Sequence, residues 1–151
     1  MSKEAGTSII ALNRRARFNF ELLEFYEGGL VLTGSEVKSI RGGNAQVNEA
    51  HAHVVGDELW LINAHIAPYI NAGYTQHDAR RTRKVLLHKK ELLKIKQARE
   101  QKGLTLVPTK LYWKKGKVKV EIALARGKKL HDKRATLKER DWNRQKQQLM
   151  K

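Results

Sequence analysis

The chain has 151 residues, enough for one domain of ordinary size, and 40% of them are apolar, so it can bury a core. The 31 Lys and Arg against 15 Asp and Glu give a formal net charge of +16, which favours a polyanionic partner, with nucleic acid the obvious candidate and an anionic membrane the rival. Cysteine is absent, which excludes disulfides, thiolate metal sites and a cysteine nucleophile, and no apolar run approaches the ~20 residues of a membrane span, so the sequence favours a cytoplasmic protein.

The first part of the chain predicts an arm, a long strand and a short helix. Residues 1–12 are expected to form a mobile N-terminal arm, which leads into the basic cluster NRRAR. Phe18 to Leu32 is rich in aromatic and branched residues, and this predicts a long strand or strand pair, bent at Gly28-Gly29. Ser35 to Arg41 is expected to form about two helical turns, with Ser35 as the N-cap.

The middle of the chain predicts two hairpins separated by a loop and a helix. Ala50 to Ile62 has alternating residues and a Gly-Asp turn, which indicates a hairpin. Ala67 to Asp78 has no sustained period and is expected to be a loop. Lys89 to Lys102 consists of strong helix formers, with Gly103 at the C′ position. Leu104 to Trp113 and Lys117 to Ala125 predict a second hairpin.

The composition changes after Ala125. From Arg126 to Lys151 there are ten Lys or Arg and three Asp or Glu, and the few apolar residues form no continuous helical stripe. This segment is therefore expected to be a basic tail that is disordered when free and folds on its partner. Residues 13–125 are expected to form one mainly-β domain, an OB-like antiparallel β-barrel with two to three flanking α-helices, because no βαβ repeat is present.

Nucleic-acid binding is the chemistry that the residues favour most. Basic clusters at Arg14–Arg17, Arg80–Lys84 and Arg126–Arg134 could converge on one polyanion, and such binding weakens steeply with salt. Neighbouring aromatic rings could stack on unpaired bases. The opposing interpretation makes the clusters solvated faces and most of these aromatics core residues, although Trp142 has no core nearby to join.

Three other functions are open on the residues alone. His51 and His53 share one face of a predicted strand and could hold a metal, but no Cys or carboxylate cluster accompanies them, so no metal site is expected. An RNA-processing enzyme could use His88 or His131, although carboxylates for metal-ion catalysis are scarce. A generic basic module could coat any nucleic acid. No cofactor is expected, since no nucleotide-binding glycine motif is present.

Several stretches resemble, in the same order, those of the SsrA-binding protein (SmpB) family. The resemblance runs from about Ile9 to Lys151, and the combination of GSEVKSIR with a downstream GKKLHDKR is highly specific. The stretches that carry it are Asn13–Arg17 (NRRAR), Gly34–Arg41 (GSEVKSIR), Arg81–Leu87 (RTRKVLL), Lys102–Pro108 (KGLTLVP) and Gly127–Arg134 (GKKLHDKR).

The resemblance implies a non-enzymatic bacterial protein of the cytoplasm, without cofactor. Members of the family bind the tRNA-like domain of transfer-messenger RNA (tmRNA, SsrA RNA) and carry it to stalled ribosomes for trans-translation. The family's body takes roughly the place of the missing anticodon arm, and its basic tail reaches the decoding centre and folds as a helix in the empty mRNA channel. The expected partners are therefore tmRNA and the ribosome, with no membrane, no DNA, and the chain acting as a monomer.

The resemblance also implies site residues. Glu27 and Leu86 match family residues needed for tmRNA binding, and His88 stands where some members have Asn. Glu36 could accept hydrogen bonds from RNA or pair with Arg or Lys inside the fold, and both alternatives stay open. The expected RNA-binding residues are Asn13, Arg14, Arg15, Arg17, Glu27, Glu36, Lys38, Arg41, Arg81, Arg83, Lys84, Leu86 and His88. The expected ribosome-contacting tail residues are Lys128, Lys129, His131, Asp132, Lys133, Arg134, Trp142, Leu149, Met150 and Lys151.

Overall fold

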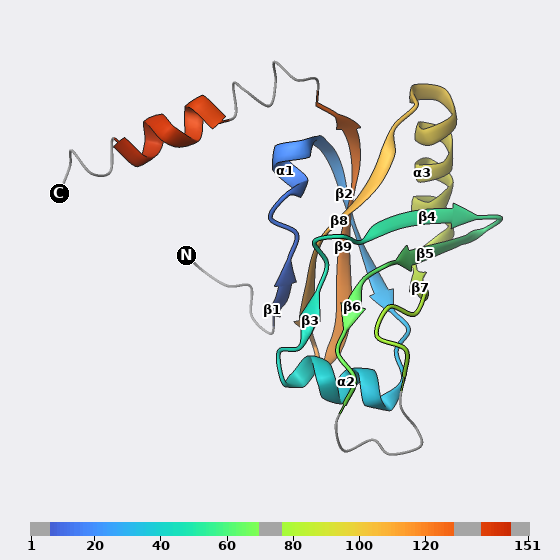
Figure 1. Ribbon diagram of the computed structural model, residues 1–151. Helices are drawn as coiled ribbons and strands as arrows, with labels where there is room; N and C mark the ends of the chain where they lie inside the picture. The colour runs from blue at the N-terminus through green and yellow to red at the C-terminus, as the bar shows by residue number, and fades with distance from the viewer. Residues whose placement is uncertain (1–6, 70–76, 129–136, 146–151) are drawn as a thin grey trace.

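The computed structural model describes residues 7–69, 77–128 and 137–145 (Figure 1). A further helical stretch covers residues 137–145. The preceding elements are, in chain order, β1 (Thr7–Leu12), α1 (Ala16–Asn19), β2 (Phe20–Leu30), α2 (Gly34–Arg41), β3 (Ala45–Gln46), β4 (His51–Val55), β5 (Glu58–Ile62), β6 (His65–Ile66), β7 (Arg83–Leu86), α3 (Lys89–Lys102), β8 (Thr105–Lys114) and β9 (Lys117–Gly127).

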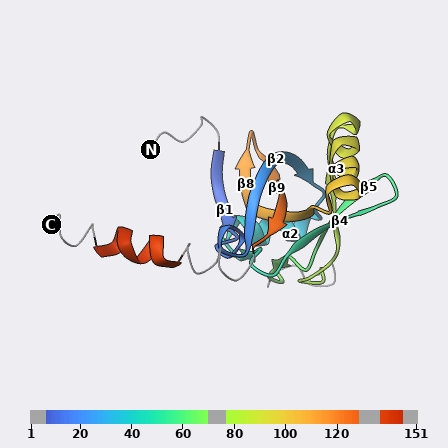
Figure 2. The same cartoon turned by 90° about the horizontal axis from the view of Figure 1, so that it is seen from above.

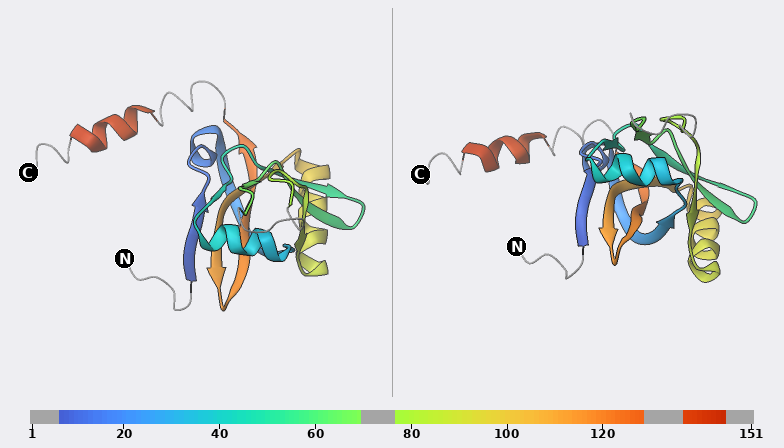
Figure 3. Two further views of the ribbon diagram at one scale, coloured as in Figure 1. Left: turned by 60° about the horizontal axis from the view of Figure 1, so that its bottom comes forward. Right: turned by 90° about the horizontal axis from the view of Figure 1, so that it is seen from below.

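One curved antiparallel sheet dominates the molecule, in the strand order β1-β8-β9-β2-β7-β5-β4, and β3 and β6 form a separate short pair. The sheet is strongly curled, as the view from above shows (Figure 2), and its edge strand β4 also contacts β8. Helix α2 lies across one end of this barrel (Figure 3), and α3 stands beside it (Figure 1). The predicted mainly-β fold, an OB-like antiparallel barrel with flanking helices, is confirmed.

The core lies inside the barrel and follows the two-residue period of the strands. On β9, Val118, Val120, Ile122 and Leu124 are buried, and this alternation with more exposed residues holds as far as Glu121, since Ala123 is buried as well. The two helices close the core with one buried isoleucine each, Ile40 from α2 and Ile95 from α3. A second, smaller cluster joins α1 to the start of β8 and the end of β9; it consists of Ala16, Val107 and Ala125.

Both predicted hairpins and the long helix are confirmed. The β8–β9 turn places Lys115 and Gly116 at φ 51° and 75°, the pattern of a type I′ turn, which matches the twist of the flanking strands. Helix α3 ends at Gly103, which adopts the left-handed conformation as predicted. The N-cap of α2 differs from the prediction: it is Thr33, which forms a capping box with Glu36, and Ser35 lies inside the helix.

The boundaries of the folded body are wider than the sequence predicted. Residues 7–12 form β1 on β8 instead of a mobile arm, because Ile10 and Ala11 pack against the core. At the other end, β9 continues past Ala125 to Gly127, and the Lys128 amide donates to the Asn19 carbonyl. Residues 1–6 lie outside the described part of the chain, as do residues 70–76 of the predicted loop.

The reason for glycine at position 28 is close packing, whereas the bend predicted at Gly28-Gly29 stays a prediction. The irregularity in β2 lies earlier, between Leu22 and Glu24. Gly28 is buried where β2 meets β7, and a Cβ there would collide with the Val85 side chain and lie 3.2 Å from the Leu86 carbonyl oxygen. The contact between these two strands therefore requires that residue 28 has no side chain.

We expect Gly28→Ala to destabilise the fold by roughly 1–3 kcal/mol, because the added methyl group overpacks the β2–β7 contact. Urea unfolding followed by circular dichroism measures the loss. Gly29→Ala is the matched control, since its Cβ would meet neighbours only at 3.7 Å and beyond and should cost less. Equal costs for the two variants would contradict the packing explanation.

Candidate nucleic-acid interface

The strand order brings three of the predicted RNA-binding residues to one open pocket of about 550 Å³. Strand β2 lies between β7 and β9, so Gly29 is paired with Leu86 on one side and Lys119 on the other. Gly29 has no side chain, and it leaves a depression between these neighbours. The residues that line the pocket are Glu27, Gly29, Leu30, Leu32, Val37, Leu86, Leu87, His88, Trp113, Gly116, Lys117, Val118 and Lys119.

Glu27 stands in this pocket as a carboxylate among lysines. It accepts a hydrogen bond from the Tyr112 hydroxyl, and the Lys114 ammonium lies 3.2 Å from its Oε2. The Tyr112 hydrogen bond lowers the pKa of Glu27, partial burial opposes this, and Lys114 lowers the pKa further. The group is therefore ionised at neutral pH, and it can accept hydrogen bonds while Lys117 and Lys119 attract phosphates.

The remaining walls of the pocket offer an imidazole and apolar surfaces. Leu86 is 55% exposed, and His88 is exposed at the N-cap of α3 without making a capping hydrogen bond. Trp113 lines the same pocket, with the Arg41 guanidinium carbon 5.9 Å from its ring centroid. Such a surface can receive a base or ribose, with cations close enough to hold the adjoining phosphates.

Two predicted RNA contacts are corrected by the structure, because Glu36 and Arg83 are fully buried. Their side chains form an ion pair, and Arg83 also donates to the backbone oxygens of Ala64 and Ala79 at 2.8 and 3.1 Å. Arg81 donates to the same carboxylate at 2.6 Å and stays partly exposed. Of the two alternatives for Glu36, the structure therefore shows pairing inside the fold.

The pKa of Glu36 reflects this network. Burial raises the pKa, but hydrogen bonds from Arg81, the Thr33 amide and Arg83 outweigh it and lower the pKa to about 2. Burial likewise lowers the pKa of Arg83, while Glu36 opposes the change. The two groups stay charged at neutral pH and tie α2 to the strand β7 that carries Leu86 to the pocket.

Three further predicted residues lie on exposed or half-exposed surface near these elements. Lys38 and Arg41 are exposed on α2, and the Lys38 ammonium lies 5.6 Å from the Tyr69 ring centroid. Lys84 on β7 forms an exposed ion pair with Glu58 at 3.3 Å. These charges remain accessible to a polyanion.

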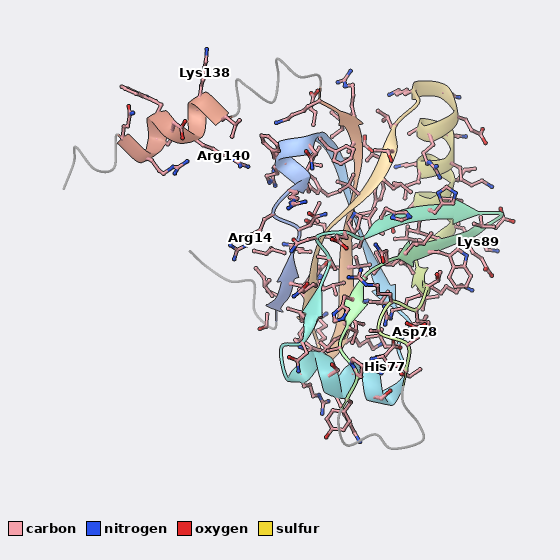
Figure 4. All side chains as sticks on the ribbon, viewed as in Figure 1. Arg14, His77, Asp78, Lys89, Lys138 and Arg140 are labelled. Atoms are coloured by element: carbon pink, nitrogen blue, oxygen red, sulfur yellow. The ribbon has the colours of Figure 1, made fainter. Side chains whose placement is uncertain are left out.

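The N-terminal basic cluster lies on another side of the barrel. Figure 4 shows Arg14 beside β1, whereas Lys89 begins α3 on the opposite side. Arg15 lines a small polar pocket together with Arg80. Asn13 is held by a 2.9 Å hydrogen bond to the Pro108 carbonyl. Arg17 is exposed over the Phe25 ring. Among the described residues, the N-terminal cluster therefore meets Arg80 of the second cluster in this polar pocket, which shares no lining residue with the pocket around Glu27.

The tail is described only in part. Lys128 is tied to the body, with its ammonium 2.8 Å from the Arg17 carbonyl oxygen. Trp142 is 56% exposed on the helical stretch 137–145, whose residues are all exposed. Arg140 of this stretch lies with its guanidinium carbon 5.6 Å from the centroid of the Phe18 ring. The predicted tail residues outside the described part are Lys129, His131, Asp132, Lys133, Arg134, Leu149, Met150 and Lys151.

His51 and His53 are exposed on β4, and across residues 7–69, 77–128 and 137–145 no group of three metal-ligating side chains could hold an ion. In those same ranges no helix is both long and apolar enough to cross a membrane.

Sequence reasoning missed Trp113, Lys117 and Lys119, which line the pocket around Glu27, and Tyr112 and Lys114, which donate to the Glu27 carboxylate. Lys117 and Lys119 carried a signal, since they alternate with buried residues and so belong to the wet face of β9. Nothing in the sequence alone places that face beside Glu27, because the pairing of β2 with β9 is formed between residues nearly a hundred positions apart.

Comparisons with known proteins identify the family. The model of the family described as "SmpB protein" matches residues 10–151. The SsrA-binding protein of Agrobacterium fabrum is 53% identical to this chain, over 99% of this chain and 94% of its own length. The SsrA-binding protein of Gloeothece citriformis is 56% identical, over 100% of this chain and 99% of its own length. A solved chain described under "tmRNA-SmpB: a journey to the center of the bacterial ribosome" is 48% identical, with a TM-score of 0.65 over 83% of this chain and 87% of its own. The chain therefore belongs to the SmpB family.

Proposed function

We propose that this chain binds tmRNA and delivers it to stalled ribosomes, where the pair starts trans-translation. The family assignment supports this function, since a relative of nearly half identical sequence is described with tmRNA on the bacterial ribosome. Within the chain, the pocket around Glu27 is the surface that we assign to tmRNA, and residues 129–151 are the segment that we assign to the ribosome.

The observation that carries the proposal is the meeting of Glu27, Leu86 and His88 in one basic pocket. They come from β2, β7 and the start of α3, and only the folded barrel brings them together. The pocket has lysines for phosphates, a carboxylate for base or ribose donors, and apolar walls for rings. This combination suits folded RNA with unpaired nucleotides better than duplex DNA, whose bases are stacked inside.

We expect the purified protein to bind a transcript of a bacterial tmRNA much more tightly than bulk tRNA or duplex DNA at ~150 mM salt. Nonspecific electrostatic binding fades at such salt, whereas contacts to the tRNA-like domain persist. Competition filter binding measures the ratio, and sequencing the RNA that copurifies from cells provides an independent check. Equal affinity for all three nucleic acids would make the chain a generic basic module.

We also propose that the chain acts by binding alone, without a catalytic step. His88 is one histidine that a nuclease could use, and it is exposed beside Lys89 and Lys90. Among the described residues, no cluster of carboxylates lies near it to hold the metal ions of a nuclease, which supports this proposal. The same labelled tmRNA, incubated with the protein with and without Mg²⁺, should stay intact. Time-dependent cleavage that disappears in His88→Ala or His131→Ala would contradict this proposal.

A further inference from the structure

The Glu27 carboxylate is held by a residue of a strand that is not its neighbour. Glu27 lies on β2 and Tyr112 on β8, and β9 separates the two strands. In the register, Tyr112 is opposite Lys119 and Glu27 is opposite Glu121, so the tyrosine reaches diagonally across β9. Its ring is buried, 7% exposed, and its hydroxyl donates to Glu27 Oε2.

We propose that Tyr112 is a positioning residue for RNA recognition, which fixes the Glu27 carboxylate so that its free lone pairs face the pocket. This inference deepens the proposed function and rests on it. The RNA group that Glu27 receives is a hydrogen-bond donor, a base N–H or a ribose hydroxyl. A phosphate is excluded at this point, because it would meet a fixed negative charge.

The surroundings explain why the carboxylate needs this constraint. The side chain of Glu27 is 39% exposed, and the Lys114 ammonium lies 3.2 and 3.3 Å from its two oxygens. Lys114 has a long, flexible side chain, whereas the buried ring of Tyr112 has little freedom. The Lys110 ammonium lies 5.3 Å from the centroid of the Tyr112 ring. A rigid donor that is already bound reduces the ordering cost of RNA binding.

A fixed carboxylate within a lysine-rich surface also helps to set the position at which an RNA strand binds on that surface. Lysines attract phosphates at any position along an RNA strand and so carry little positional information. The Glu27 carboxylate repels phosphates and accepts hydrogen bonds only from N–H or O–H groups. Fewer positions of the RNA strand along the surface are therefore favourable. The hydroxyl of Tyr112 thereby contributes to specificity although it lies beneath the carboxylate that meets RNA.

The test compares Tyr112→Phe with Tyr26→Phe, because both changes remove one hydroxyl from a buried tyrosine that donates to a carboxylate of the same sheet. Tyr26 donates to Glu24 at 2.7 Å, and neither residue lines the Glu27 pocket. We expect Tyr112→Phe to weaken binding of a tmRNA transcript by roughly three- to tenfold, the worth of one net hydrogen bond, and Tyr26→Phe to leave it unchanged.

Two further measurements separate positioning from general damage. Titration of the Glu27 carboxyl carbon by NMR should show a higher pKa in Tyr112→Phe than in the parent protein, since the hydroxyl is the main cause that lowers it. In the double variant Glu27→Gln/Tyr112→Phe, binding should be no weaker than in Glu27→Gln alone, because the tyrosine acts only through the carboxylate.

The outcomes distinguish the inference from the function on which it rests. If Glu27→Gln weakens tmRNA binding and Tyr112→Phe does not, the positioning role is wrong and the proposed function stands. If Tyr112→Phe weakens binding equally with and without Glu27, the tyrosine acts by another route. If Glu27→Gln itself leaves tmRNA binding unchanged, the assignment of tmRNA to this pocket is wrong.

Discussion

Glu36→Gln is expected to destabilise the folded body by roughly 3–5 kcal/mol, the cost of leaving one member of a buried ion pair without its partner. Arg83 is fully buried against Glu36, and its guanidinium stays charged, so the amide that replaces the carboxylate leaves that charge uncompensated. The total stability of a domain is about 5–15 kcal/mol, so this one change removes a large share of it.

The loss should extend beyond the ion pair because Glu36 joins α2 to β7 and to the segment that precedes β7. Its carboxylate accepts from the Thr33 amide at the start of α2, from Arg81 ahead of β7 and from Arg83 on β7. Arg83 in turn holds the backbone of Ala64 and Ala79. Loosening this network also loosens the strand that places Leu86 in the RNA pocket.

Guanidinium chloride unfolding followed by circular dichroism measures the effect, and Glu58→Gln is the matched control. Glu58 has the same charge and pairs with Lys84 of the same strand, but both side chains are more than 40% exposed, so its loss should cost about 0–1 kcal/mol. If the Glu36 variant does not fold, Arg81→Met tests the partly exposed partner instead. A Glu36 variant as stable as the Glu58 variant would contradict a central role for the cluster.

The same carboxylate contributes to the acid dependence of stability. The pKa of Glu36 falls from an ordinary 4.5 to about 2 on folding, so its contribution is fully present above pH 4.5 and is lost as the pH falls towards 2. The shift corresponds to roughly 3 kcal/mol at 1.36 kcal/mol per pKa unit. Unfolding curves recorded between pH 6 and 2 should therefore show a smaller acid loss in Glu36→Gln than in the parent protein.

The sequence predicted the elements with a strong local signal. Helix α3 and its terminal Gly103 and the hairpin turn at Gly116 were all placed correctly, because helix formers, capping residues and turn residues act on their nearest neighbours. The family motifs also identified Glu27 and Leu86, which the structure brings to one pocket.

The errors came from long-range pairing, which no local pattern reports. Residues 7–12 form a strand because β8 offers them an edge about a hundred positions away, and Gly28 is required by a contact with Val85. Glu36 and Arg83 lie within motifs that resemble an RNA-binding family, and for Glu36 the sequence left open whether it accepts hydrogen bonds from RNA or pairs inside the fold. Only the fold shows that the two charges are buried against each other.

The structure moves the boundary between body and tail from Ala125 to Lys128. This boundary decides where the tail can be removed without damage to the body. Arg126 and Gly127 are paired with β2, and Lys128 is bonded through its backbone and its ammonium to the carbonyls of Asn19 and Arg17. A chain ending at Lys128 keeps these contacts, whereas one ending at Ala125 loses them and loosens α1. Only the first truncation separates the function of the tail from damage to the body.

We expect the chain of residues 1–128 to bind tmRNA within about threefold of the full-length affinity at moderate salt and to lose ribosome rescue completely. It retains the pocket around Glu27 and a net charge of +11, whereas residues 129–151 carry eight Lys or Arg and three Asp or Glu. The slope of log affinity against log salt concentration should become less steep, in proportion to the number of phosphates that the tail neutralises. Peptide tagging on ribosomes stalled in a reconstituted translation system measures rescue.

A full-length variant with residues 129–151 in permuted order distinguishes the charge of the tail from its sequence. If the tail acts only as a polycation, permutation should restore rescue together with the salt slope. If it acts through ordered contacts, the salt slope should return and rescue should not, because Trp142 and the basic residues would no longer be placed at the spacing that a helix gives them. We expect the second outcome. Normal rescue by residues 1–128 would contradict the division of tasks altogether, since the body alone would then suffice on the ribosome.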